Sequence, residues 1–269
     1  MKRYLLGLAL LPLFLTTGCG FKWWQESSQS LNGNDTTPAM KKQGMVFILP
    51  GIQGVDDHYK TIRQGLRSAG VRCAITIQAW GSQIPGVKLA ANQLDTVAAR
   101  NSGKDIAQII LAYQRQYPGR TVHLIGQSAG SAVAVFALEA LAESGAKPVA
   151  GVILLDASLS ADYDLTTALG KSTKGIVNFC NIEDVAVLEV GTAVVGNLDG
   201  GHGDSAGRTG FEARYSKLHQ VKVTPDMVSV DSASHFADTT AAFTANYIAP
   251  WIMGQHWPVA VAGASAGAQ

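Results

Sequence analysis

One short segment constrains the fold more than any other, because it joins a strand to a helix through a turn that favours small residues. The apolar run 121–125 predicts a buried strand, and the apolar run 129–143 predicts a buried helix. Between them lies the pentapeptide Gly126-Gln127-Ser128-Ala129-Gly130. Its two outer glycines have no Cβ atom, so the strand and the helix can approach closely. The segment therefore predicts a sharp corner with Ser128 at its tip.

Strand and helix signals alternate through the rest of the chain, from about residue 45 to residue 254. Further strands are expected at 45–49, 71–79, 149–155, 176–180 and 227–230, and further helices from Asp56 to Gly70, around 106–113 and at 239–251. Hydrophobic residues make up 47% of the chain, which is enough for a sizeable core. The pattern predicts one α/β domain at 45–254, a mainly parallel sheet of about six strands with helices on both faces.

The N-terminus, residues 1–19, has the pattern of an export signal. Two basic residues precede an apolar run at 4–15, which is too short to span a bilayer of about 30 Å as a helix. A small residue followed by Cys19 resembles the lipobox of bacterial lipoproteins, although Thr16 stands where leucine is usual. This resemblance implies a lipoprotein of the bacterial cell envelope, anchored in the membrane by lipid on Cys19. Without that lipid, the protein would be periplasmic or secreted.

The segments around the expected domain are polar or simple in composition. Residues 20–44 predict a flexible linker, and residues 255–269 predict a disordered tail. The formal net charge of +1 and the absence of a basic run give no electrostatic reason to expect nucleic-acid binding. Cys73 and Cys180 lie in apolar runs, so we expect buried thiols rather than the disulfide that an oxidising compartment would also allow.

The corner at Ser128 supplies a candidate nucleophile. In a strand–turn–helix setting, a glycine-x-serine-x-glycine sequence lifts the serine hydroxyl above the sheet edge, at a helix N-terminus that favours developing negative charge. A serine hydroxyl is a weak nucleophile at neutral pH and needs a base within hydrogen-bond reach. The chain has six histidines that could serve. The alternative interpretation is a glycine-rich turn that carries no chemistry.

At these residues the chain resembles the α/β-hydrolase superfamily. The resemblance covers about 45–254 and rests on the segments LPGIQG (49–54), HLIGQSAGS (123–131), NFCNIED (178–184) and SHF (234–236). It implies a catalytic triad in the chain order serine, acid, histidine. In that order His235 is the base, since it follows the last expected strand and precedes the last expected helix. Asp184 is the first choice for the acid, Asp156 the second and Glu183 the third.

The same resemblance implies an oxyanion hole, a pair of backbone N–H groups that bind the negative oxygen of the tetrahedral intermediate. One donor is expected from Ala129 and the other from Ile52, with Gln53 as the alternative to Ile52. Because the first expected strand leads straight into this turn, the sheet should be an α/β-hydrolase sheet that lacks its first two strands. The glycine-rich segment 189–211 is expected to form a lid or a substrate wall.

Together these residues predict a serine hydrolase that cleaves a carboxylic ester or thioester through an acyl-enzyme on Ser128. We expect a monomer that acts on a small-molecule or lipid ester and needs no cofactor. Asp199, His202 and Asp204 could be taken for metal ligands, but their spacing matches no tight zinc pattern, so no metal is expected. An acyltransferase would use the same residues with another acceptor. A non-catalytic envelope protein that binds or scaffolds is the alternative from another class.

Overall fold

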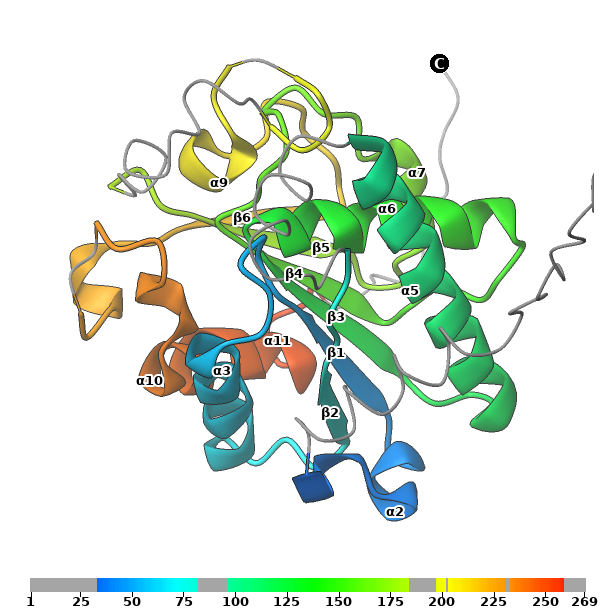
Figure 1. The fold of residues 1–269 in the computed structure, drawn as a ribbon. Coiled ribbons are helices and arrows are strands. Elements are labelled where there is room, and N and C mark those ends of the chain that lie inside the picture. The colour runs from blue at the N-terminus through cyan, green and yellow to red at the C-terminus, as the bar shows by residue number, and fades with distance from the viewer. Residues whose placement is uncertain (1–32, 82–95, 184–196, 202, 231–232, 259–269) are drawn as a thin grey trace, which may run out of the picture.

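One sheet of parallel strands organises the fold. A computed structural model describes residues 33–81, 96–183, 197–201, 203–230 and 233–258. Six strands lie in the order β2-β1-β3-β4-β5-β6, and each neighbouring pair is parallel (Figure 1). They are β1 (Met45–Leu49), β2 (Ala74–Ile77), β3 (Val122–Gln127), β4 (Gly151–Leu155), β5 (Ile176–Cys180) and β6 (Leu218–Lys222). The predicted α/β class, with a mainly parallel sheet of about six strands, is confirmed.

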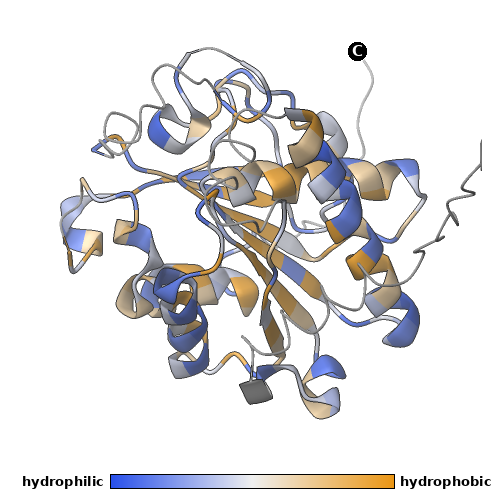
Figure 2. Ribbon diagram, viewed as in Figure 1, coloured by the Kyte–Doolittle hydropathy of each residue, from blue (hydrophilic) through white to orange (hydrophobic). Residues whose placement is uncertain are grey.

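Helices cover both faces of the sheet, and strands β1 to β5 are therefore buried at every position. One face packs on α5 (Thr96–Gln116), α6 (Ala129–Glu143) and α7 (Thr166–Gly170), and the other on α3 (Asp57–Ser68) and the C-terminal helices (Figure 1). Alternate residues of each strand enter different cores: Leu124 lies in the first core and Ile125 in the second. Figure 2 shows the most apolar residues gathered in the strands and on the inner sides of the helices.

The last strand is not where the sequence predicted it. The structure has β6 at Leu218–Lys222, whereas 227–230 contains only the end of a short 3-10 turn, η3 (Pro225–Met227). The prediction of a strand at 227–230 is therefore wrong. β6 lies at the edge of the sheet and is only partly buried, so its sequence lacks the continuous apolar run of the inner strands. Met227 and Val228 instead pack, half-buried, against the second core.

Two helical regions also differ from the prediction. Helix α5 begins at Thr96, before the apolar spacing that identified it. The last helix is divided into α10 (Ala241–Phe243), a π-helical turn η5 (Thr244–Ile248) and α11 (Ala249–Ile252). Pro250 explains the division, because proline has no N–H and its ring would clash with the carbonyl four residues earlier in a regular α-helix. The wider π turn accommodates this ring.

Packed structure continues beyond both ends of the expected domain. Before β1 lie η1 (Gly33–Thr36) and α2 (Pro38–Lys41), and Asp35 forms ion pairs of 3.0 Å with Arg63 and with Arg67 of α3. At the other end Trp257 is buried and donates its indole N–H to the carbonyl of Trp251 over 2.7 Å. The expected signal at 1–19, and the linker and tail residues 20–32 and 259–269, lie outside the described residues. None of the helices that the structure describes is both long enough and apolar enough to cross a membrane.

The two cysteines of the domain are free thiols in the structure. Cys180 is buried at the end of β5, and Cys73 is half-buried just before β2. Burial raises the pKa of both thiols. Strands β2 and β5 are separated by three others in the sheet, which at about 4.8 Å per step puts them roughly 19 Å apart. A disulfide between them is therefore excluded by geometry, whatever the redox conditions.

His123 should make the stability of the fold depend on pH. Its side chain in β3 is 4% exposed, and burial, assisted by the nearby charge of Lys174, lowers its pKa to about 4. In the unfolded chain an imidazole titrates at about 6.5. Between these two values the unfolded chain binds a proton that the folded chain does not. The free energy of unfolding should therefore fall as the pH falls from 6.5 towards 4.

Urea unfolding of the wild type and of His123→Leu, at pH 7 and at about pH 4.5, measures this contribution. Leucine suits the site, because within the described part of the chain Nε2 of His123 has no hydrogen-bond partner. Between the two pH values the wild type should lose about 2 kcal/mol more than the variant does. The same loss in both proteins would show that His123 does not carry the effect.

Candidate active site

Ser128 lies at the strained corner that the sequence predicted. It follows β3 and precedes α6 with φ 52° and ψ −124°, a conformation that residues other than glycine rarely adopt. Its N–H donates to the carbonyl of Leu155 over 2.8 Å, and its carbonyl accepts from the N–H groups of Ser131 (2.9 Å) and Ser158 (3.3 Å). The half-buried side chain makes no capping hydrogen bond to its helix. Hydrogen bonds thus fix the backbone of Ser128, while its hydroxyl is not used to cap the helix.

The two glycines of the corner are required by packing. A Cβ atom on Gly130 would clash with the carbonyl oxygen of Leu49 at the end of β1. A Cβ atom on Gly126 would lie 2.5 Å from the carbonyl oxygen of Gly130. Helix α6 therefore begins in direct contact with two strand ends, at a separation that no side chain permits. This close approach is the reason that the turn at Ser128 is so sharp.

An acidic side chain stands beside Ser128 on the neighbouring strand. β3 and β4 pair with Gln127 opposite Leu155, so the next residues, Ser128 and Asp156, both emerge at the carboxyl end of the sheet. Adjacent strands lie about 4.8 Å apart, which makes these two residues neighbours. Asp156 also has a positive φ, 46°, and Ser128 and Asp156 are the two non-glycine residues with this property in the described part of the chain. Strain of this kind is concentrated at functional sites.

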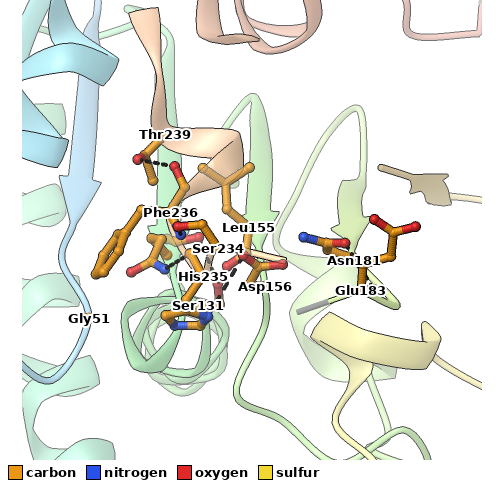
Figure 3. A network of polar contacts seen from close by, with 12 residues as sticks. Gly51, Ser131, Leu155, Asp156, Asn181, Glu183, Ser234, His235, Phe236 and Thr239 are labelled. Atoms are coloured by element: carbon orange, nitrogen blue, oxygen red, sulfur yellow. Dashed lines mark hydrogen bonds and ion pairs between the residues drawn. The ribbon is translucent and has the colours of Figure 1, made fainter. Parts of the chain in front are cut away.

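His235 lies against this carboxylate. The distance from its Nδ1 to Oδ2 of Asp156 is 3.9 Å, and the exposed fractions of the two side chains are 20% and 2% (Figure 3). This distance is longer than a hydrogen bond, but catalytic contacts are often long before a substrate binds. The backbone of His235 is tied to the corner as well, because the side-chain amide of Gln127 donates to its carbonyl over 3.2 Å. The structure thus brings Ser128, Asp156 and His235 to one edge of the sheet.

The loop that carries His235 is held by α3. Phe236 stacks on His58 with ring centroids 4.0 Å apart, and its ring meets that of His235 edge-on at 5.5 Å. The hydroxyl of Thr239 donates to the carbonyl of Phe236 over 2.7 Å, and Thr61 of α3 donates to the carbonyl of Thr239 over 2.7 Å. These contacts fix the loop on the N-terminal part of α3, close to the turn after β1.

That turn, residues 51–54, is where the sequence predicted the second oxyanion donor. It is closed by a hydrogen bond from the N–H of Gly54 to the carbonyl of Gly51, 3.0 Å long. The N–H of Gly51 is occupied by the hydroxyl of Tyr59 at 2.8 Å. In the part of the chain that the structure describes, the N–H groups of Ile52 and Ala129 have no hydrogen-bond acceptor. They are the two N–H groups that the sequence predicted as donors to an oxyanion.

Of the other two predicted acids, the structure describes only Glu183. Asp184, the first choice from the sequence, lies outside the described residues. Glu183 is exposed, and its N–H donates to the side chain of Asn181 over 3.1 Å. Figure 3 shows Asn181 and Glu183 well separated from His235. Asp156 is therefore the predicted acid that the structure describes beside the histidine.

The glycine-rich segment 189–211 is described from residue 197 onward, except for His202. Its described part packs on the loop after Asp156: the N–H of Leu198 donates to the carbonyl of Ser158 (3.1 Å), and Asp199 accepts from the N–H of Ser160 (3.1 Å). Helix α9 (Ala206–Thr209) packs so closely there that a Cβ atom on Gly207 would clash with the backbone of Asp156. This part of the segment packs directly beside Asp156.

The suggested metal ligands in this segment have other partners. Asp199 accepts the hydrogen bond from Ser160, and Asp204 forms an ion pair with Arg208 at 3.4 Å. His202 lies outside the described residues. Among the residues that the structure describes, no group of histidine, cysteine and acidic side chains could hold a metal ion.

Comparison with known proteins identifies the family. A family model described as "Bacterial virulence protein (VirJ)" matches residues 63–251, which is most of the chain. The chain belongs to the VirJ family. Its sheet of six parallel strands, with helices on both faces, is the architecture that the predicted α/β-hydrolase fold requires. As expected for a sheet without the first two strands, β1 leads directly into the turn at Gly51.

Several solved structures are similar to this chain. EstE7, a homologue of hormone-sensitive lipase from a metagenome library, is 14% identical over 82% of this chain and 81% of its own, with a TM-score of 0.48. The esterase domain of a Rhodothermus marinus protein is 14% identical over 80% and 88%, with a TM-score of 0.44. RedJ, a thioesterase of Streptomyces coelicolor, is 12% identical over 71% and 80%, with a TM-score of 0.41. No curated protein matches the chain. Similarity this low carries no information about the substrate.

Proposed function

We propose that the protein is a serine hydrolase that cleaves a carboxylic ester or thioester through an acyl-enzyme on Ser128. The observation that carries this proposal is the strained corner at Ser128, with His235 and the carboxylate of Asp156 at the same edge of the sheet. Within the described residues the N–H groups of Ile52 and Ala129 have no acceptor, which supports the proposal further, since a developing oxyanion needs two such donors.

The proposed reaction uses the same groups in both half-reactions, formation and hydrolysis of the acyl-enzyme. The hydroxyl oxygen of Ser128 attacks the acyl carbonyl carbon while Nε2 of His235 takes the hydroxyl proton. The N–H groups of Ile52 and Ala129 bind the resulting oxyanion. The histidine then gives its proton to the leaving alcohol or thiol, and the acyl group stays on Ser128. Water, deprotonated by His235, then attacks the acyl carbon, and the histidine returns the proton to the oxygen of Ser128 as its bond to the acyl group breaks and the acid leaves.

Asp156 is the proposed acid of the triad. A carboxylate next to Nδ1 holds the imidazole in the tautomer that leaves Nε2 unprotonated, and it stabilises the imidazolium that forms. The 3.9 Å approach of Oδ2 to Nδ1 and the burial of the Asp156 side chain support this role. Asp184 is the competing candidate because of its position after β5 in the chain.

A fluorophosphonate probe and p-nitrophenyl esters test the proposal. Ser128→Ala should abolish labelling and turnover, and His235→Ala should lower kcat at least about a thousand-fold while the protein stays folded. Ser144→Ala is the control, because this exposed serine lies at the other end of α6. Labelling of Ser128→Ala at the wild-type rate would refute the role of Ser128. A folded wild type that neither labels nor turns over would instead favour a binding or scaffolding protein.

Replacing each candidate carboxylate by its isosteric amide identifies the acid of the proposed triad. Asp156→Asn should lower kcat by about a hundred-fold to ten-thousand-fold, because an amide next to Nδ1 favours the wrong tautomer. Asp184→Asn and Glu183→Gln should stay within a few-fold of the wild type. Ester turnover gives kcat for the three variants, and circular dichroism shows whether each one is folded. A large loss in Asp184→Asn with normal turnover in Asp156→Asn would assign the acid to Asp184.

We also propose that the protein is exported and anchored to a membrane by lipid on Cys19. The signal pattern at 1–19 supports this proposal. On detergent phase separation the expressed full chain should enter the detergent phase, and Cys19→Ser should move it to the aqueous phase. Cys73→Ser, which alters a cysteine of the folded domain, should behave as the wild type does. A Cys19→Ser protein that stays in the detergent phase would contradict lipid attachment at this residue.

A further inference from the structure

We infer that Tyr59 and Gln127 are positioning residues, which together set the distances between the oxyanion turn, Ser128 and His235. The inference rests on the proposed function, and it assigns a role to two side chains outside the triad, of which Gln127 occupies a variable position of the pentapeptide. It comes from a chain of three hydrogen bonds that joins all three parts of the site.

The chain of hydrogen bonds has one direction. The N–H of Gly51 donates to the hydroxyl oxygen of Tyr59 over 2.8 Å, and the Tyr59 hydroxyl donates to Oε1 of Gln127 over 2.9 Å. The Nε2 amide group of Gln127 donates to the carbonyl of His235 over 3.2 Å. Because a backbone N–H can only donate and a carbonyl can only accept, each side chain has a single satisfied orientation. The network therefore connects the turn, the corner and the histidine loop in one defined arrangement.

Burial makes this network rigid. Tyr59 is 0% exposed and Gln127 is 1% exposed, so solvent water has little access to replace a lost partner. Burial also raises the pKa of Tyr59 well above its ordinary value, which keeps the hydroxyl protonated as the donor to Gln127. The space is limited as well, since a Cβ atom on Gly51 would lie 2.9 Å from Oε1 of Gln127 and 3.3 Å from the Cβ of Ser128.

The pairing of the strands does not by itself fix the distances between the turn, Ser128 and the histidine loop. β1 and β3 pair with Leu49 opposite Gly126, which fixes the strand ends but not the turn beyond Leu49. The loop of His235 belongs to no strand of the described residues, and Gln127 is one hydrogen-bonded link from it to the corner. A catalytic base or oxyanion donor displaced by about 1 Å can cost a hundred-fold in rate. Two buried side chains that together link the turn to the histidine loop are therefore placed to control turnover without touching the substrate.

The test compares Tyr59→Phe, Gln127→Leu and the double variant with the wild type, using p-nitrophenyl butyrate hydrolysis and fluorophosphonate labelling. Each single variant should lower kcat by about ten-fold or more and keep KM within about two-fold, because neither residue binds substrate. The double variant should lose little more than Gln127→Leu alone, since both changes break one network. Tyr59→Phe keeps the ring and its packing, so it remains informative if Gln127→Leu fails to fold.

Two control variants separate positioning from general stability. The hydroxyl of Tyr113, in the first core, donates to the carbonyl of Lys41 over 2.7 Å, whereas Tyr59 lies in the second core. Gln220 of β6 holds Phe211 through hydrogen bonds of 2.6 Å and 2.8 Å. Tyr113→Phe removes the hydroxyl of a buried tyrosine, and Gln220→Leu removes the amide of an exposed glutamine, so both should leave kcat unchanged whatever they do to the melting temperature.

The outcomes distinguish this inference from the proposed function. If the wild type hydrolyses the ester in a Ser128-dependent way and the Tyr59 and Gln127 variants do so at its rate, the inference is wrong and the proposed function stands. Equal losses of kcat in the two control variants would also overturn it. If the wild type has no Ser128-dependent turnover or labelling, the proposed function fails and the inference fails with it.

Discussion

The contact between the N-terminus of α6 and the ends of β1 and β3 is the constraint on which the candidate site depends. There is no room for a Cβ atom at Gly130 against the carbonyl of Leu49, or at Gly126 against the helix. This crowding forces Ser128 to a φ of 52° and leaves its hydroxyl without a capping role. A looser packing of the helix on the sheet would allow an ordinary helix start, with the serine oxygen bonded to its own helix.

Parallel pairing then brings the acid to the nucleophile. The hydrogen bond from the N–H of Ser128 to Leu155 extends the β3–β4 pairing by one residue, and Asp156 follows Leu155 directly. Both residues leave the sheet at its carboxyl edge, where α/β proteins commonly bind ligands. The histidine comes from outside the sheet, so it depends on α3 and on Gln127 for its position. Two parts of the candidate triad are thus set by strand register and the third by side-chain contacts.

The accuracy of the sequence prediction follows the degree of burial. Five of the six predicted strands were recovered, because both of their faces are covered and their sequences are continuous apolar runs. β6 was missed because an edge strand with the sequence LHQVK carries no such run. The interruption of the last helix at η5 follows from Pro250, a residue visible in the sequence whose effect on the helix was not predicted.

The sequence by itself determined the corner at Ser128, because strand, turn and helix there are adjacent in the chain and the glycines are a local requirement. It also indicated His235, by its order in the chain. Only the tertiary structure decided that Asp156 lies beside that histidine and that Tyr59 joins Gly51 to Gln127. These contacts connect residues far apart in the chain, such as Tyr59 and Gln127, and they depend on strand register and helix packing. Local sequence patterns carry no signal for distances of that kind.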